Sequence, residues 1–278
     1  MKGWPFALCL LLSACGSLPA PAERHRHADR LAAAHDWVAV RLPAGPFDLT
    51  AYLPAHPEAA DTLTIYIEGD GLAWIDRTRI SSDPTPLDPL GLRLALAHPG
   101  GNAAYLARPC QYAGTGRTAC DRSDWTDRRF APGVIEATLH AIDQLKQRFD
   151  ARRLTLVGYS GGGAVAALAA ARRTDVTLLV TVAGNLDHAA WTRHHRISPL
   201  SGSLNSADET ARLAGVRQLH LAGGRDAIVP PSLTTAFADR FPASQRPEVR
   251  IEPTFDHRCC WPDAWPRISR EILAIPAR

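Results

Sequence analysis

Short runs of apolar residues recur along the chain and predict a mostly parallel β-sheet. Two early runs, Trp37–Val40 and Leu49–Leu53, are separated by Pro43, Gly45 and Pro46, which predicts an antiparallel hairpin. The later runs are continuously apolar, as expected of strands that are buried on both faces of a parallel sheet. These later runs are Leu63–Ile67, Ala103–Ala107, Leu154–Val157, Thr177–Val182, Leu219–Ala222 and Val249–Ile251.

Stretches with helical periodicity lie between several of these runs. Val134–Phe149 has apolar residues at spacings of three and four, and Gly161–Arg173 is rich in alanine with a cationic end. This alternation predicts one doubly wound α/β domain over residues 37–278. Residues 185–215 break the alternation, so we expect a small cap insertion over the carboxyl edge of the sheet, where ligands bind in such folds.

The composition fits a single globular domain and does not suggest nucleic acid as a partner. The chain has 278 residues, of which 46% are hydrophobic. Lys and Arg number 31 against 28 Asp and Glu, and the basic residues are scattered rather than gathered in a stripe with interleaved aromatics.

The N-terminus differs from the rest of the chain. After Lys2 comes an apolar stretch, Trp4–Leu12, which is too short to span a bilayer, followed by Ser13-Ala14-Cys15. This pattern resembles the lipobox of bacterial lipoproteins. The resemblance implies a signal peptide over residues 1–14 and a lipid attached to the Cys15 thiol. An ordinary secretory signal is the alternative.

Export follows from either interpretation of the N-terminus. If the lipoprotein resemblance holds, Gly16 rather than Asp follows the lipidated cysteine, which implies an outer-membrane protein facing the periplasm. Residues 15–36 contain Pro19 and Pro21 in a polar stretch, and we expect them to form a tether without packed structure.

Four cysteines remain for the folded part. Cys110 and Cys120 flank a glycine-containing loop, so a local disulfide is expected in an oxidising compartment. The adjacent Cys259 and Cys260 could bridge each other, or one could pair elsewhere. Neither pair has the CxxC spacing of zinc sites, so no metal is expected.

A nucleophile motif follows the strand predicted at Leu154–Val157. The pentapeptide Gly158-Tyr159-Ser160-Gly161-Gly162 also opens the predicted alanine-rich helix. A serine in this strand-turn-helix setting is held on a sharp turn with its hydroxyl exposed, whereas the alternative is a glycine-rich turn with an incidental serine.

Two partners that such a serine requires occur downstream. A nucleophilic serine needs a histidine to take its proton and an acid to orient that histidine. Asp226 follows the run Leu219–Ala222, and His257 follows Val249–Ile251. With the order Ser, Asp, His, the chain resembles the α/β-hydrolase superfamily over about residues 37–275. The resemblance implies that Ser160, Asp226 and His257 are the catalytic triad.

Other residues compete for these roles. Asp226 could instead cap the helix predicted near residues 231–239, with Asp187 as the rival acid. The insertion histidines are expected to be solvated or to belong to a lid, His140 to lie on a helix surface, and Asp256 to be a loop carboxylate. These insertion histidines are His188, His194 and His195.

Acyl transfer also needs two backbone N–H groups directed at the developing oxyanion. Gly161, directly after the nucleophile, supplies one. By the same resemblance, Asp70 in the loop Glu68-Gly69-Asp70-Gly71 supplies the other, although a histidine is common in the family where this chain has Glu68. An Asp70 side chain is expected to point away from an oxyanion. A β-turn without catalytic function is the alternative for this loop.

The sequence thus predicts an enzyme that hydrolyses an ester or thioester of a small acyl substrate, without cofactor or metal. Residues 72–92 are expected to border the pocket, and Arg77 and Arg79 within them could favour an anionic substrate or be solvated. A different class of protein stays open, namely an envelope lipoprotein that uses the same fold as a binding or structural module. The membrane would be a partner through the lipid on Cys15.

Overall fold

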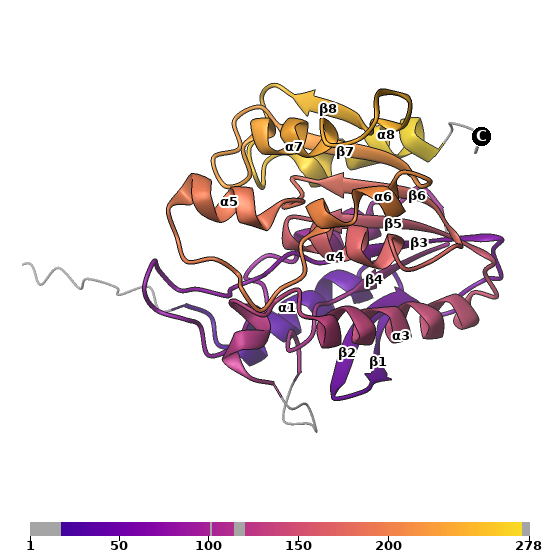
Figure 1. The fold of residues 1–278 in the computed structure, drawn as a ribbon. Coiled ribbons are helices and arrows are strands. Elements are labelled where there is room, and N and C mark those ends of the chain that lie inside the picture. The colour runs from indigo at the N-terminus through magenta and orange to yellow at the C-terminus, as the bar shows by residue number, and fades with distance from the viewer. Residues whose placement is uncertain (1–17, 101, 114–119, 274–278) are drawn as a thin grey trace, which may run out of the picture.

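The computed structural model describes residues 18–100, 102–113 and 120–273, which form one twisted sheet with helices on both faces (Figure 1). The sheet has eight strands in the order β1-β2-β4-β3-β5-β6-β7-β8. The strands are β1 Trp37–Ala44, β2 Phe47–Pro54, β3 Thr62–Ile67, β4 Ala103–Leu106, β5 Arg153–Tyr159, β6 Val176–Val182, β7 Arg217–Gly223 and β8 Glu248–Glu252.

The predicted strand directions are confirmed. Strands β1 and β2 form an antiparallel hairpin in which Ala44 pairs with Phe47. Strand β2 pairs with β4 in antiparallel fashion, and every pair from β4 through β3 to β8 is parallel. The carboxyl ends of β3, β5, β7 and β8 therefore meet at one edge of the sheet, which is where the candidate site lies.

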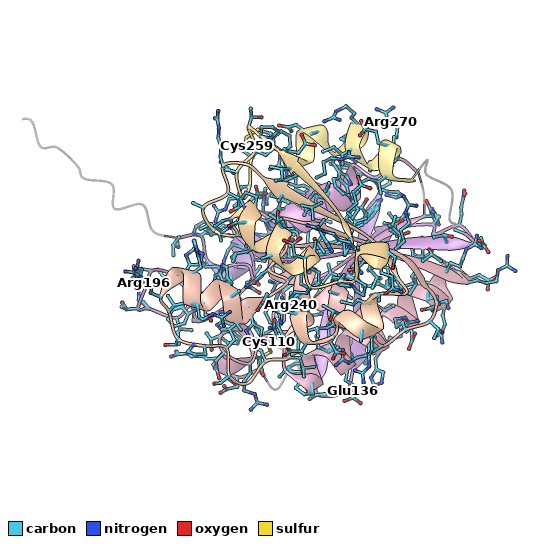
Figure 2. The ribbon with its side chains drawn as sticks, turned by 45° about the horizontal axis from the view of Figure 1, so that its top comes forward. Cys110, Glu136, Arg196, Arg240, Cys259 and Arg270 are labelled. Carbon is cyan, nitrogen blue, oxygen red and sulfur yellow. A yellow bond between two sulfur atoms is a disulfide. The ribbon has the colours of Figure 1, made fainter. Side chains whose placement is uncertain are left out.

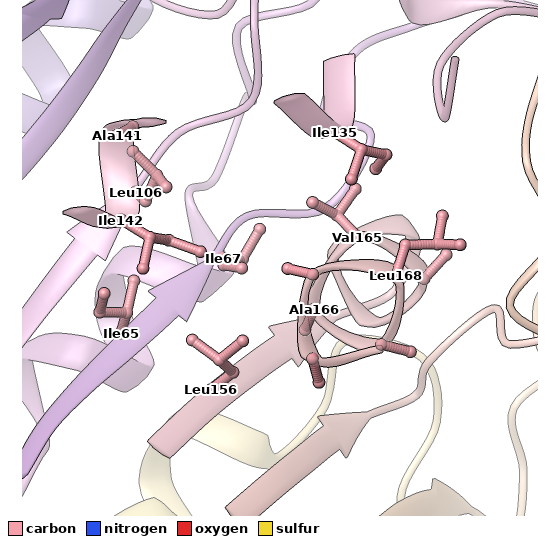
Figure 3. Packing of buried hydrophobic residues seen from close by; sticks show 14 of the residues in the cluster. Ile65, Ile67, Leu106, Ile135, Ala141, Ile142, Leu156, Val165, Ala166 and Leu168 are labelled. Atoms are coloured by element: carbon pink, nitrogen blue, oxygen red, sulfur yellow. The ribbon is translucent and has the colours of Figure 1, made fainter. Parts of the chain in front are cut away.

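Two apolar clusters cover the two faces of the sheet because strand residues point alternately to either side. Helices α3, α4, α6 and α7 cover one face, where Ile65, Ile67 and Leu156 pack against Ile142 and Val165 (Figure 3). Helices α1, α2 and α8 cover the other face. The helices are α1 Pro21–Ala33, α2 Leu90–Leu96, α3 Pro132–Arg148, α4 Gly161–Ala170, α5 His188–His195, α6 Thr210–Leu213, α7 Pro231–Ala238 and α8 Trp261–Leu273, with 3-10 turns η1 Arg122–Trp125, η2 Ser206–Asp208 and η3 Ala243–Gln245.

Helix α1 corrects the prediction of an unstructured tether over residues 15–36. Its buried residues Arg24, Ala28 and Ala32 are spaced four apart, so they form one stripe against the domain. Asp29 accepts a hydrogen bond of 2.8 Å from the Tyr52 hydroxyl. Small alanines and one buried arginine give a weak apolar pattern, which is why this stripe looks polar in the sequence.

Only part of the predicted cap insertion lies over the carboxyl edge. Helix α5 extends to the left in Figure 1, the direction in which β6 and β8 point. The later part of the insertion contacts α4, where the Ser206 hydroxyl of η2 donates to the Ala164 carbonyl. Helix α5 is the part of the insertion that lines the cavity, through Trp191.

Two disulfides are present, Cys110–Cys120 and Cys259–Cys260. The expected local bridge is confirmed, and of the two alternatives for the adjacent pair, the structure has the bridge between neighbours. Figure 2 shows Cys110 and Cys259 far apart, so the two bridges hold different loops.

The predicted signal peptide, residues 1–14, and the predicted lipid attachment site, Cys15, lie outside the described residues. Within the described ranges, no helix has both the length and the apolar character needed to cross a bilayer.

Candidate active site

Ser160 occupies the sharp turn between β5 and α4. Its backbone has φ 52° and ψ −121°, in the left-handed region of φ that L-residues rarely adopt. The turn needs glycine nearby, since a Cβ on Gly158 would lie 2.3 Å from the Gly162 carbonyl oxygen. The close approach of strand and helix therefore explains the glycines around Ser160.

Ser160, His257 and Asp226 form a hydrogen-bonded row. The Ser160 Oγ lies 3.0 Å from Nε2 of His257, and the His257 Nδ1 lies 2.8 Å from Oδ2 of Asp226. With a proton on Nδ1 donated to the carboxylate, Nε2 is free to accept the serine proton. Ser160 precedes His257 by 97 residues and Asp226 precedes it by 31, yet the fold brings all three together for proton transfer.

Asp226 and His257 are both held in place by their surroundings. The second oxygen of the buried Asp226 carboxylate accepts hydrogen bonds from the backbone N–H groups of Ile228 and Val229, each of 2.8 Å. The Tyr159 hydroxyl donates to the His257 carbonyl at 3.2 Å, and the Tyr159 ring contacts the imidazole. Asp226 therefore both closes its loop and orients the histidine.

The rival acid Asp187 lies elsewhere. It caps α5 by accepting a hydrogen bond from Ala190 N–H and pairs with Arg240 at 3.2 Å. Asp256 accepts hydrogen bonds from backbone N–H groups of its own loop, as predicted for a loop carboxylate. His140 is exposed on its helix, also as predicted.

The insertion histidines differ among themselves. His188 is buried against Phe130, and burial lowers its pKa, so its predicted solvation is wrong. The His195 Nε2 lies 2.8 Å from the Ile228 carbonyl and helps to hold α5 against the Asp226 loop. In the part of the chain that the structure describes, no group of three or more His, Cys, Asp or Glu residues could hold a metal ion.

The loop after β3 approaches the nucleophile turn closely. A Cβ on Gly161 would lie 2.1 Å from Asp70 Oδ1, and a Cβ on Gly69 would lie 3.3 Å from the Ser160 Cβ. Neither Asp70 nor Gly161 donates its backbone N–H to another group among the described residues. Both N–H groups are therefore available beside Ser160.

Two buried arginines hold the Asp70 side chain. Arg108 contacts Oδ1 at 3.1 Å and Arg129 contacts Oδ2 at 2.6 Å. Burial alone would raise the pKa of Asp70, but the charges of Arg129 and Arg108 outweigh it and hold that pKa below its ordinary value. The carboxylate lies against Gly161, and the two arginines compensate its charge.

Glu68 is a buried carboxylate at the start of the same loop. It accepts hydrogen bonds from the Gly69 N–H at 2.9 Å and from the Gly91 N–H at 3.1 Å, which joins the loop to α2. Burial raises the pKa of Glu68 to about 7, although these hydrogen bonds oppose the rise. Glu68 therefore joins the loop after β3 to the start of α2.

Glu68→Gln is expected to change how stability depends on pH. Glu68 in the folded protein binds a proton between pH 4.5 and about 7, where an unfolded glutamate does not, so folding stability falls as pH rises through this range. Glutamine removes this contribution. Urea unfolding should show the variant gaining about 3 kcal/mol relative to wild type between pH 4.5 and pH 8. A constant difference over that range would contradict the assignment.

A cavity of about 720 Å³ opens beside Ser160 and His257. Its walls come from the loop after β3, from α5 and from the loops after β7 and β8. Trp74, Leu87, Trp191 and Ile228 supply apolar surface, and Arg225 and Arg258 supply charge. The Trp191 indole donates to the Ile228 carbonyl at 2.7 Å, which places α5 on the cavity wall.

Several supporting residues had no recognisable sequence signal. Arg108, Gln111 and Arg129 hold the Glu68–Gly71 loop from distant segments, and Gln111 donates to the Gly69 carbonyl at 2.9 Å. Tyr159 could have been noticed as the variable residue of the nucleophile motif. The arginines could not, because nothing in their local sequence points to residue 70.

The architecture is that of the α/β-hydrolases. No family model and no curated protein matches the sequence. Three solved structures are similar in fold. Est1E from Butyrivibrio proteoclasticus with ferulic acid bound is 15% identical, with a TM-score of 0.60 over 85% of this chain and 98% of that one.

The other two come from other organisms. Esterase Pf2001 from Pyrococcus furiosus is 13% identical, with a TM-score of 0.60 over 93% of this chain and 96% of that one. XC6422 from Xanthomonas campestris, described as a serine hydrolase without lid, is 15% identical, with a TM-score of 0.54 over 87% and 97%. At these identities the likeness establishes the α/β-hydrolase fold and nothing finer.

Proposed function

We propose that the protein is a serine hydrolase that cleaves a carboxylic ester or thioester through an acyl-enzyme on Ser160. The observation that carries this proposal is the row in which Ser160 Oγ, His257 and Asp226 are joined by contacts of 3.0 and 2.8 Å. Support also comes from two structures of the same fold, Est1E with ferulic acid and Pf2001, the second of which is named an esterase.

The reaction follows from the positions of these atoms. The Ser160 Oγ attacks the acyl carbon while its proton moves to Nε2 of His257, and the Asp226 carboxylate stabilises the imidazolium. The N–H groups of Asp70 and Gly161 stabilise the oxyanion. Collapse expels the alcohol or thiol, which takes the proton from His257. Water then attacks the acyl-enzyme by the same route and releases the acid.

Transient kinetics with p-nitrophenyl esters of increasing acyl length tests the proposal. A burst of nitrophenol close to one equivalent per active site is expected wherever hydrolysis of the acyl-enzyme is slower than its formation. The length dependence reports how far the cavity accommodates the acyl chain. A folded protein that turns over none of these esters, nor the corresponding thioesters, would contradict the proposal.

Arg129→Met is expected to impair the oxyanion loop. The change removes one of the two cations on Asp70, so the Asp70 N–H loses its defined position beside Ser160. We expect kcat to fall by about 10- to 100-fold with a small change in KM, because a complete loss of one oxyanion donor costs 10²–10³. Steady-state kinetics measures both parameters.

A matched control separates this effect from general loss of charge. Arg267→Met removes an arginine from the exposed pair with Glu271 on α8. An exposed pair contributes little to stability, so this variant should keep wild-type kcat. Equal kinetic losses in both variants would contradict the assigned role of Arg129.

We also propose that the protein is exported and lipid-anchored through Cys15, with the anchored domain facing the periplasm. The support is the apolar stretch before Ser13-Ala14-Cys15. Metabolic labelling with a palmitate analogue is expected to mark the wild-type protein and to disappear in Cys15→Ser. Label that persists in Cys15→Ser would contradict the anchor.

A further inference from the structure

The cavity mouth carries exposed apolar side chains on its outer rim. Trp74 is 40% exposed, Leu87 is 37% exposed and Ile228 is 50% exposed, and all three line the same cavity. They come from two loops that are distant in sequence. Single exposed apolar residues are ordinary, but several gathered around one opening mark a surface that contacts something apolar.

Cations border the same rim. Arg225 and Arg258 line the cavity and are exposed, and neither side chain has an ion pair or hydrogen bond within the described part of the chain. The acidic residues of the rim are engaged. Asp88 pairs with Arg93 at 3.0 Å. The Asp256 carboxylate accepts hydrogen bonds from the backbone N–H groups of residues 258 and 259, and it also interacts electrostatically with Arg258. With Asp88 paired to Arg93, the rim has two arginines, Arg225 and Arg258, against the single carboxylate of Asp256, so its net charge is positive.

The start of α1 lies close to this rim. The Arg24 guanidinium donates to the carbonyls of Asp83 and Thr85, in the segment that leads to Leu87. Cys15, the proposed lipid attachment site, precedes Arg24 by nine residues, which can span about 30 Å at most. A lipid on Cys15 would keep this side of the domain near the bilayer.

We infer that the rim formed by Trp74, Leu87, Ile228, Arg225 and Arg258 docks on an anionic lipid bilayer, so that the acyl substrate enters the cavity from the membrane. Tryptophan and aliphatic side chains insert at the bilayer interface, and arginines contact lipid phosphates. The proposal that this surface docks on a bilayer depends only on the rim residues. The origin of the substrate rests on the proposed hydrolase function.

Vesicle binding of the unlipidated chain isolates the contribution of the rim. A chain that begins at Gly16, and so lacks Cys15 and its lipid, keeps every described contact, because all of them lie within residues 18–273. Co-sedimentation with phosphatidylglycerol–phosphatidylcholine vesicles should show binding that weakens as salt rises, with little binding to phosphatidylcholine alone. Absence of binding to the anionic vesicles would overturn the inference.

Double variants with matched controls test whether the rim arginines are the residues that bind the vesicles. Arg225→Gln/Arg258→Gln should lower the partition constant by about 25-fold, or fivefold per arginine. The control Arg148→Gln/Arg270→Gln removes the same charge from α3 and α8, and Figure 2 shows Arg270 on a different side from Cys259. Equal losses in the two pairs would indicate nonspecific attraction and overturn the inference.

A second pair of variants tests whether the exposed apolar side chains of the rim contribute to vesicle binding. Trp74→Ser/Ile228→Ser should lower the partition constant by tenfold or more, since inserted apolar surface is lost. The control Val38→Ser/Ile251→Ser alters exposed apolar residues of β1 and β8 and should bind as wild type. Retained binding in the Trp74 variant would overturn the inference.

The binding assay does not depend on catalysis. Ser160→Ala should bind vesicles as wild type does, and hydrolysis of soluble p-nitrophenyl acetate is measured separately. Failure of vesicle binding with intact hydrolysis overturns the docking surface alone, whereas failure of hydrolysis with intact binding overturns the proposed function alone.

Discussion

Replacing Ser160 with alanine is expected to lower kcat for ester hydrolysis by about 10⁴- to 10⁶-fold, because the acyl-enzyme can no longer form. The fold should persist, since the serine hydroxyl contacts the cavity and His257 rather than the apolar core. Alanine adopts the same left-handed φ of 52° with a comparable strain. Steady-state kinetics with a p-nitrophenyl ester, together with a thermal unfolding curve, measures both effects.

The control for this variant is Ser244→Ala. Ser244 is an exposed serine in η3, in a different loop from the site. Its removal should leave kcat and KM unchanged. A Ser160→Ala protein that is folded and retains more than about one hundredth of wild-type kcat would contradict the role of Ser160.

The second large effect is expected for Asp226→Asn. Asparagine keeps the shape of the side chain, but its amide would favour the wrong tautomer of His257 and would leave the imidazolium without a compensating charge. We expect kcat to fall by about 10⁴-fold, as such a replacement does in a serine protease triad. The loss should be present at every pH at which the wild-type enzyme is active.

Two other aspartates serve as matched controls. Asp187→Asn changes the cap of α5 and its pair with Arg240, and Asp256→Asn changes a loop carboxylate beside His257. Both should retain kcat within about tenfold of wild type, because neither carboxylate contacts the imidazole ring. If Asp187→Asn lost more activity than Asp226→Asn, the acid would have to be reassigned.

The parts of the site that could be predicted follow from local patterns. Strands buried on both faces give continuous apolar runs, and the order of nucleophile, acid and histidine can be matched to the strand ends. Parallel strands bring their carboxyl ends to one edge, so Ser160, Asp226 and His257 had to lie at the same edge. The structure adds their contacts and excludes Asp187 as a neighbour of His257.

The remaining parts depend on long-range contacts that leave no local pattern. Arg108 and Arg129 reach Asp70 across 38 and 59 residues, and an isolated arginine does not indicate which carboxylate it meets. Helix α1 was missed because Ala28 and Ala32 bury little apolar surface each. The sequence also could not show that two arginines compensate the charge of Asp70, which allows its carboxylate to lie beside Gly161.

A fluorophosphonate probe tests the central claim most directly. The probe phosphonylates an activated serine hydroxyl with loss of fluoride, and it requires the proton acceptor and the oxyanion donors as well as the serine. Mass spectrometry of the digested protein is predicted to find the adduct on the peptide containing Ser160 in wild type and no adduct in Ser160→Ala. A folded wild-type protein that is not labelled, or equal labelling of both proteins, would contradict the claim that Ser160 is an activated nucleophile.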